Sequence, residues 1–118
     1  MIDKNFWGQS LHINLHECDN TKLSEDNLKE FCKLLCDEIK MQRYGEAMVE
    51  RFGSGKLVGN SALQFIHTSN ISIHTDEFFN RVFVDIFSCK KFDRYKAKSF
   101  SKKFFCAKKA NSRFLNRF

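Results

Sequence analysis

Residues 61–75 read Ser-Ala-Leu-Gln-Phe-Ile-His-Thr-Ser-Asn-Ile-Ser-Ile-His-Thr. Apolar residues alternate there with Ser, Thr, Asn and His in two short runs, a pattern that predicts two strands, each with one buried and one polar face. Hydroxyl, amide and imidazole side chains crowd around Ser69, and neither Gly nor Pro marks the turn between the runs. Because local rules are broken most often at functional sites, Ser69 and its neighbours are the first candidates for chemistry.

The same reasoning predicts the elements on either side of this stretch. Leu11, Ile13 and Leu15 alternate with polar residues, and Ser24 is a suitable N-cap for the first of two amphipathic helices. The predicted elements are strands at 9–18, 44–52, 61–67, 70–75 and 81–88, helices at 24–41 and 93–106, and a short edge strand within 107–118.

This order of elements predicts the fold class. Short connections favour an antiparallel sheet, and two amphipathic helices can cover one of its faces, which gives an α+β two-layer sandwich. The 118 residues are expected to form one domain, 1–118. Residues 53–60 are predicted to be a loop, and the Gly-x-Gly-Lys fragment at 53–56 is not a P-loop, because a strand rather than a helix is expected after it.

Composition excludes several classes of protein. No apolar run reaches about 18 residues, so no membrane span is expected, and no secretory signal is visible at the N-terminus, which favours a cytoplasmic location. The five cysteines are odd in number and form no Cys-x-x-Cys motif, so free thiols are expected rather than disulfides or a metal site.

The net charge of +6 is concentrated at one end of the chain. Residues 90–118 contain eleven Lys and Arg but one acidic residue, Asp93. A basic segment of this kind can bind nucleic acid or an anionic surface. No aromatic-basic recognition motif accompanies it, so a solvated helix face and tail is the favoured interpretation, and nucleic acid is not an expected partner.

The residues near Ser69 allow a hydrolase hypothesis. Ser69 or Cys89 would be the nucleophile, His74 the base and Asp85 the residue that orients the base. The sequence contains no Gly-x-Ser-x-Gly motif to expose the serine on a sharp turn, so this hypothesis has little support.

A second pattern is more specific. Residues 69–75 read Ser-Asn-Ile-Ser-Ile-His-Thr, and residues 84–89 read Val-Asp-Ile-Phe-Ser-Cys. Together they resemble the bacterial S-adenosylmethionine decarboxylase proenzyme family, in which the pattern is Ser-His-x-x-Ile-His-Thr followed by Val-Asp-x-Phe-Thr-Cys. His74 and Cys89 have the family's spacing, and the resemblance covers most of residues 8–105.

The resemblance implies a cofactor made from the chain itself. The Ser69 hydroxyl would attack the carbonyl of Thr68, the Thr68–Ser69 bond would be cleaved, and Ser69 would become a pyruvoyl group that forms a Schiff base with the substrate amine. His74 matches the base of this processing step, about one strand-turn from Ser69, and Ser61 matches a serine that assists it.

The resemblance also implies roles in substrate chemistry. Cys89 matches the residue that reprotonates the substrate carbon, Phe52 an aromatic that stacks on adenine, and Glu77 the nearest replacement for a ribose-binding glutamate. The implied substrate is S-adenosylmethionine, the implied pathway is spermidine and polyamine biosynthesis, and the implied assembly is a homodimer.

Three residues depart from the family pattern and leave alternatives open. Thr68 stands where the family often has an acidic residue, Asn70 replaces the histidine that usually follows the serine, and Phe78 occupies the position of the ribose-binding glutamate. One alternative is a homologue that is not processed and serves as a pseudoenzyme or binding module. Another is a decarboxylase of a different amino acid, such as ornithine or arginine.

Overall fold

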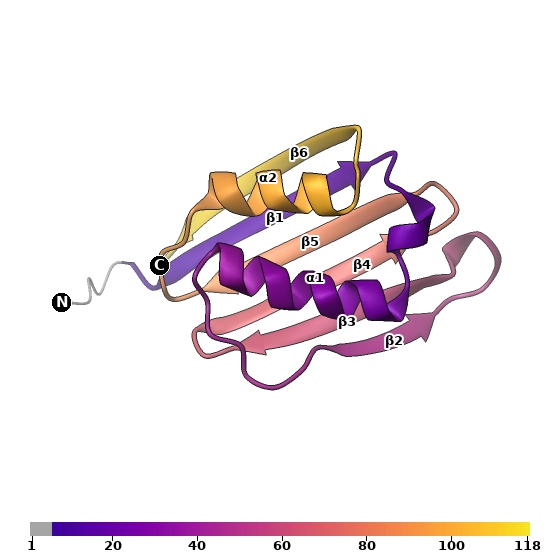
Figure 1. Cartoon of the computed structure of the whole chain (residues 1–118). Coiled ribbons are helices and arrows are strands. Elements are labelled where there is room, and N and C mark those ends of the chain that lie inside the picture. The colour runs from indigo at the N-terminus through magenta and orange to yellow at the C-terminus, as the bar shows by residue number, and fades with distance from the viewer. Residues whose placement is uncertain (1–5) are drawn as a thin grey trace.

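The computed structural model describes residues 6–118. It contains six strands, two α-helices and two short 3-10 turns (Figure 1). The strands are β1 (Gly8–His16), β2 (Met48–Phe52), β3 (Gly59–Ile66), β4 (Ser69–Asp76), β5 (Arg81–Ser88) and β6 (Lys109–Arg117). The helices are α1 (Glu25–Glu38) and α2 (Arg94–Phe104), and the 3-10 turns are η1 (Asn20–Lys22) and η2 (Gly55–Leu57).

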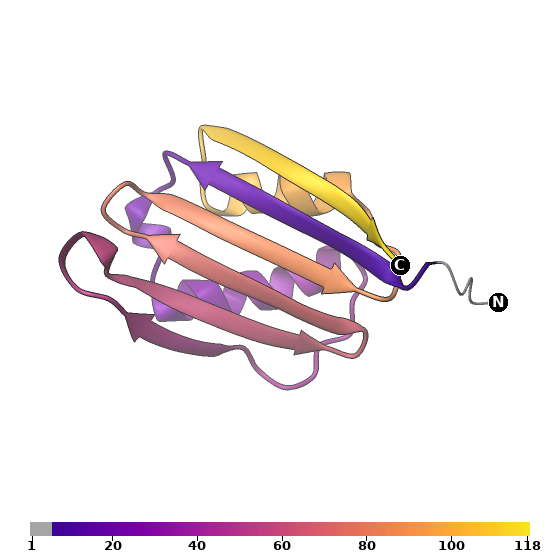
Figure 2. The same cartoon turned by 180° about the vertical axis from the view of Figure 1, so that it is seen from behind.

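All six strands belong to one sheet in the order β2-β3-β4-β5-β1-β6, and every neighbouring pair is antiparallel. Both helices lie on one face of this sheet, as Figure 1 shows, and Figure 2 shows the other face without helices. The predicted α+β two-layer sandwich is therefore confirmed. The predicted C-terminal edge strand is longer than expected, because β6 pairs with β1 along nine residues.

The core lies between the sheet and the helices. Inward-facing residues of β1, β4 and β5 alternate with outward-facing ones, so that Ile13, Ile73 and Val84 are fully buried. Phe31 of α1 contacts the rings of Phe100, Phe104 and Phe105, with centroids 4.7–5.9 Å apart. The phenylalanines of the second helix therefore pack in the core, as the amphipathic pattern predicted.

The region between β2 and β3 is more ordered than the predicted loop at 53–60. Gly55–Leu57 forms η2, and β3 begins at Gly59, which pairs with Phe52. A Cβ atom at Gly59 would lie 2.2 Å from the carbonyl oxygen of Thr75, so only glycine allows β3 and β4 to approach here. Strand β3 therefore begins two residues earlier, at Gly59, than the alternation of side chains predicted.

The sheet face opposite the helices, which we call the open face, carries many apolar side chains. Alternation along each strand places these residues on it: Met48, Phe52, Leu63, Phe65, Phe83, Phe87 and Leu115. Four of the seven are about half exposed, at 47–60%. This density of exposed apolar side chains on one face is typical of an interaction surface.

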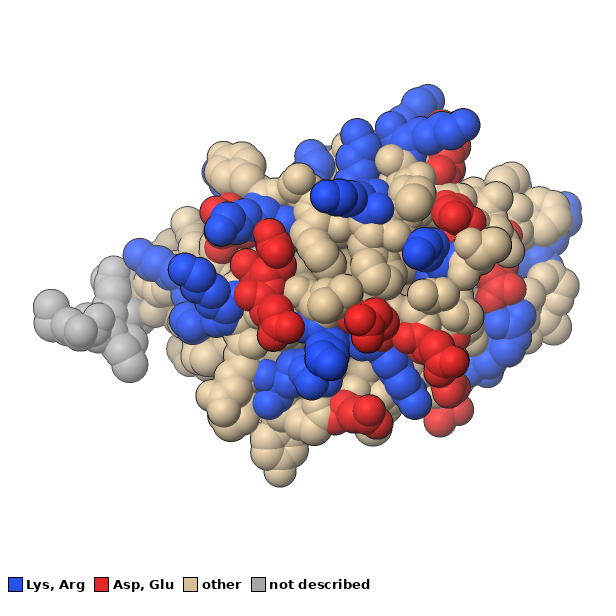
Figure 3. Space-filling view, viewed as in Figure 1, with Lys and Arg blue, Asp and Glu red and all other residues tan. Residues whose placement is uncertain are grey.

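The helix-bearing face carries basic and acidic side chains interspersed with one another (Figure 3), so the positive charge of residues 90–118 does not form one continuous surface there. Within residues 6–118, no helix is long and apolar enough to cross a membrane.

Candidate functional site

The turn between β3 and β4 contains the peptide bond predicted to be cleaved. Ile66 pairs with Ser69, so His67 and Thr68 alone form the turn. The backbone N–H of Cys89 donates to the carbonyl oxygen of Thr68 at 2.9 Å. Ser69 has a φ of 156°, outside the usual β region for a residue with a side chain. Thr68, Ser69, Ser88 and Cys89 thus lie together, and we call them the cleavage cluster.

The second group of predicted residues lies on the open face. Ser61 and His74 are cross-strand partners on β3 and β4, and the Ser61 hydroxyl lies 2.9 Å from His74 Nδ1. Phe52 points to the same face from β2 and is 60% exposed. We call Phe52, Ser61 and His74 the histidine cluster. Its hydrogen bond fixes the orientation of the imidazole ring.

The two clusters do not meet within one chain. His74 comes five positions after Ser69 along β4, and at about 3.3 Å per residue this is roughly 16 Å. A side chain cannot transfer a proton directly over that distance. The expected proximity of His74 to Ser69 is therefore absent within a single copy of the chain, although each cluster is well formed.

Glu77 lies just beyond the end of β4 and is engaged by an arginine. Both carboxylate oxygens accept hydrogen bonds from the Arg51 guanidinium, at 2.6 and 2.9 Å. These hydrogen bonds hold the pKa of Glu77 below its usual value. A ribose hydroxyl would have to share or replace the arginine, so Glu77 is not a free ligand in this arrangement.

The structure also reveals a polar pair that sequence reasoning missed. His12 Nδ1 lies 2.7 Å from Asp85 Oδ1, and both residues are in the middle of the open face. Asp85 therefore contacts His12 rather than His74, which removes the orienting residue from the hydrolase hypothesis. Strand pairing between β1 and β5 creates this contact, and neither strand's own pattern reveals it.

An open hollow of about 410 Å³ is lined by Tyr44, Phe65, Ile66 and His67. Ile66 pairs with Ser69 and His67 precedes Thr68, so the hollow borders the hairpin that carries the cleavage cluster. The Tyr44 and His67 rings lie edge to face, with centroids 5.9 Å apart. Aromatic walls next to a reactive group suit a flat or apolar ligand. His67 could have been suspected from its position beside Thr68, whereas nothing in the sequence places Tyr44 there.

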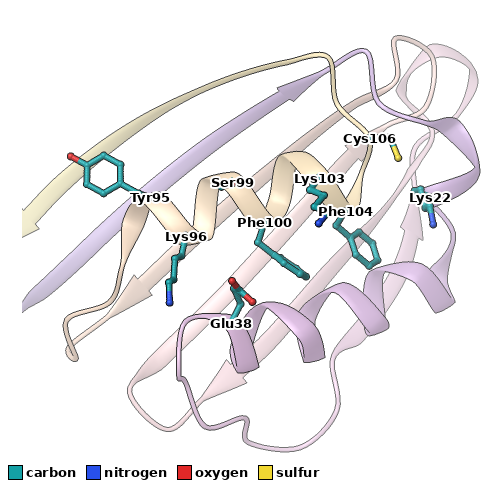
Figure 4. Close-up of a pocket in the computed structure, with 9 residues that line it drawn as sticks. All are labelled: Lys22, Glu38, Tyr95, Lys96, Ser99, Phe100, Lys103, Phe104 and Cys106. Atoms are coloured by element: carbon teal, nitrogen blue, oxygen red, sulfur yellow. The ribbon is translucent and has the colours of Figure 1, made fainter.

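A larger groove, of about 770 Å³, lies between α1 and α2 on the helix side of the sheet (Figure 4). Its floor contains Phe100, with Lys96 and Glu38 at one end and Lys22 at the other. It contains none of the predicted site residues and opens on the face opposite to His74. The larger of these two cavities is therefore not the one near the candidate catalytic residues.

The five cysteines are free thiols, as predicted. Burial raises the pKa of Cys32 to about 12 and those of Cys18 and Cys36 to about 11. Cys89 is exposed, at the end of β5. Burial therefore keeps three thiols protonated and unreactive. Cys89, by contrast, is accessible and lies beside Ser69. Among the described residues, no group of three or more potential ligands could hold a metal ion.

The residues present suit a pyruvoyl group derived from Ser69. The carbonyl of the bond that would be cleaved is polarised by the N–H of Cys89, and the residue after the bond, Ser69, carries the attacking hydroxyl. Cys89 also provides an accessible thiol. No external group has to be accommodated, because the prosthetic group would be formed from the chain.

Comparisons with known proteins show the fold and the family of the chain. The chain has the same fold as the crystal structure of the adenosylmethionine decarboxylase from Aquifex aeolicus VF5, with a TM-score of 0.80 at 18% identity over 96% of this chain and 92% of that chain. None of the curated proteins compared with the chain matches it. The model of the S-adenosylmethionine decarboxylase family matches residues 9–118. The chain therefore belongs to the S-adenosylmethionine decarboxylase family.

Proposed function

We propose that this protein is a self-processing, pyruvoyl-dependent decarboxylase that acts on S-adenosylmethionine and supplies the aminopropyl donor of spermidine biosynthesis. The observation that carries the proposal is the hydrogen bond from the Cys89 N–H to the Thr68 carbonyl oxygen, at 2.9 Å. This donor polarises the carbonyl and would stabilise the negative charge that develops on its oxygen during attack.

The cleavage is an acyl shift followed by an elimination. The Ser69 oxygen bonds to the Thr68 carbonyl carbon, the Thr68–Ser69 C–N bond breaks, and the hydroxyl proton passes to the freed amine. Loss of the Ser69 α-proton with departure of the Thr68 carboxylate gives dehydroalanine, and its hydrolysis releases ammonia and leaves a pyruvoyl group. The unusual φ of Ser69 supports this assignment, because strain of about 1–3 kcal/mol would be relieved when the bond breaks.

Residues of the cleavage cluster would also serve the decarboxylation. When present, the pyruvoyl group supplies a carbonyl that accepts the electrons released with CO₂. The Cys89 thiol is exposed next to residue 69 and is the proton donor of the proposal. The aromatic hollow at Tyr44, Phe65 and His67 lies beside the same position and would exclude water from one side of the substrate.

A homodimer is part of the proposal, because one chain does not bring the two clusters together. His74 lies roughly 16 Å along β4 from Ser69. A second copy stacked on the apolar open face in antiparallel orientation would bring its histidine cluster toward the cleavage cluster of the first copy. In that arrangement His74 and Ser61 act on the partner's Thr68–Ser69 bond, and Phe52 contacts the partner's substrate.

The ion pair at Glu77 favours a second substrate hypothesis. Because Arg51 binds both oxygens of Glu77, the carboxylate could accept hydrogen bonds from a ribose only after this ion pair had rearranged. A substrate without ribose, such as ornithine or arginine, needs no such contact. Radiolabelled CO₂ release from the three amino acids, measured in parallel, distinguishes these substrates.

Mass analysis of the denatured protein tests the processing step. Processed protein should separate into fragments 1–68 and 69–118, with the second fragment blocked by pyruvoyl at its N-terminus. The Ser69→Ala variant should remain intact, because it lacks the attacking hydroxyl. A wild-type chain that stays intact after long incubation would contradict the proposal and favour the non-processing homologue, which would bind S-adenosylmethionine without releasing CO₂.

A further inference from the structure

We infer that Ser88 is a positioning residue for self-cleavage, and that it acts through the Thr68 hydroxyl. The inference rests on the proposed function, because it concerns the same peptide bond. Ser88 Oγ lies 2.8 Å from Thr68 Oγ1, and Ser88 is fully buried at the end of β5. Ser88 is also the cross-strand partner of Ser69, so it contacts the residues on both sides of the bond to be cleaved.

The hydrogen bonds around Ser88 form a short network. The Lys90 N–H donates to Ser88 Oγ at 3.0 Å. Either hydroxyl can donate to the other across the 2.8 Å contact. The hydroxyl that does not donate there can donate to Met41 Sδ, which lies 3.6 Å from Thr68 Oγ1 and 3.9 Å from Ser88 Oγ. In both arrangements each hydroxyl proton has an acceptor.

This network holds Thr68 at two points. The Cys89 N–H binds the Thr68 carbonyl oxygen, and Ser88 binds the Thr68 side chain. One hydrogen bond would let the peptide plane rotate about the carbonyl contact, whereas two contacts from consecutive residues fix the direction of the carbonyl. Attack by the Ser69 hydroxyl requires that direction, because a misplacement of about 1 Å can slow a reaction by about 100-fold.

The pattern of β5 supports the inference independently. The inward-facing residues Val82, Val84 and Ile86 are apolar and buried, and the next inward position is Ser88. A valine there would continue the core without the cost of burying a hydroxyl. Packing therefore does not account for serine at this position, whereas its hydrogen bonds with Thr68 and the Lys90 N–H do.

The reaction that Ser88 assists is the first bond exchange of processing. The Ser69 Oγ–Thr68 carbon bond forms, the Thr68–Ser69 C–N bond breaks, and the proton of the Ser69 hydroxyl ends on the Ser69 amine. Ser88 exchanges no proton or electron pair in this step. It keeps the Thr68 carbonyl oxygen on the Cys89 N–H while the carbonyl carbon becomes tetrahedral.

The test is the rate constant for conversion of newly refolded full-length chain into its two fragments, followed by denaturing mass analysis. Ser88→Ala should lower this rate about 10- to 100-fold, and Ser88→Thr, which keeps the hydroxyl, should restore most of it. Thr68→Val should slow cleavage to a similar extent. The double variant should be no slower than either single variant, because the two hydroxyls act through one contact.

The matched control is Ser101→Ala. Ser101 is also a fully buried serine, and its hydroxyl donates to the Ala97 carbonyl at 2.7 Å within α2, away from Thr68. Its truncation should lower thermal stability without changing the cleavage rate. Equal rates for wild type and Ser88→Ala, or equal slowing by Ser101→Ala, would overturn the inference and leave the proposed function intact. A wild-type chain that is never cleaved would overturn both.

Discussion

Three buried cysteines show how environment sets the chemistry of a single residue. Cys18, Cys32 and Cys36 lie in the core, and desolvation raises their pKa values from 9.0 to about 11, 12 and 11. In the unfolded chain these thiols lose their protons near the ordinary pKa. The folded state therefore binds more protons than the unfolded state once the pH exceeds about 9.

The free energy of unfolding is expected to fall as the pH rises from about 9 toward the folded pKa values, and to be insensitive to these thiols below about pH 9. Cys32→Ala removes the thiol with the largest shift, so its stability should decline less steeply with pH than that of wild type. Urea unfolding between about pH 8 and about pH 11 measures both slopes. Cys89→Ala, which removes an exposed thiol, is the control and should follow wild type. Parallel curves for Cys32→Ala and wild type would contradict the assignment.

At the residue scale, the sequence predicted which residues belong to the candidate site, and their spacing, better than it predicted the contacts between side chains. Ser69, His74 and Cys89 could be singled out because their spacing matches a known pattern. The Ser88–Thr68 contact depends on β5 ending beside the hairpin turn, and the His12–Asp85 contact depends on the register of β1 against β5. Alternation within one strand says which face a residue occupies, but it does not give the register between strands.

At the scale of the element, the helices are specified by their caps as well as by their apolar faces. Asp93 precedes α2, and its carboxylate accepts from the backbone N–H groups of Tyr95 and Lys96, both at 3.0 Å. Helix α2 has no acidic residue in its first turn and has Lys102 and Lys103 in its last turn. The cap is thus a principal stabilising contact at the N-terminus of this helix.

Asp93→Ala is expected to lower the free energy of unfolding by about 1 kcal/mol, because it leaves two N–H groups of the first turn without their side-chain acceptor. Asp93→Asn keeps an equally good cap and removes only the charge, so it should cost a few tenths of a kcal/mol. Thermal unfolding of the two variants beside wild type provides the comparison. Equal losses in both would show that charge, rather than capping, is the main contribution.

Element boundaries were predicted less accurately than the elements themselves, and the reason is physical. Gly59 lacks a side chain, so it adds nothing to the alternation that marks a strand, yet its missing Cβ is what lets β3 approach Thr75. In the polar C-terminal tail, β6 forms because β1 offers an unpaired edge over nine residues. Tertiary pairing, rather than local composition, determines both boundaries.

At the scale of the whole molecule, the sheet is covered on one side only. The helices cover the face that contains Ile13 and Val84, while the open face presents half-exposed apolar residues and the histidine cluster. The cleavage cluster lies at one end of β4, and the histidine cluster lies near the other end. Two copies stacked in antiparallel orientation would bring the histidine cluster of each copy toward the cleavage cluster of the other, at two equivalent places.

Co-expression of two inactive variants tests whether His74 acts on the partner chain. Ser69→Ala lacks the attacking hydroxyl but keeps His74, whereas His74→Ala keeps Ser69 but lacks the base. Each variant alone should remain intact. When both are made in one cell, with tags of different mass, the His74→Ala chain should be cleaved in mixed dimers, because the Ser69→Ala partner provides its imidazole.

The identity of the cleaved chain makes this experiment decisive. If His74 acted within its own chain, the His74→Ala chain would stay intact whatever its partner, because its own base would be missing. Mixing the purified variants under conditions where dimers do not exchange provides the control, and should give no cleavage. Cleavage of the His74→Ala chain on its own would instead mean that His74 is not the base, and that Ser69 relies on a nearer group such as the His67 ring in the hairpin turn.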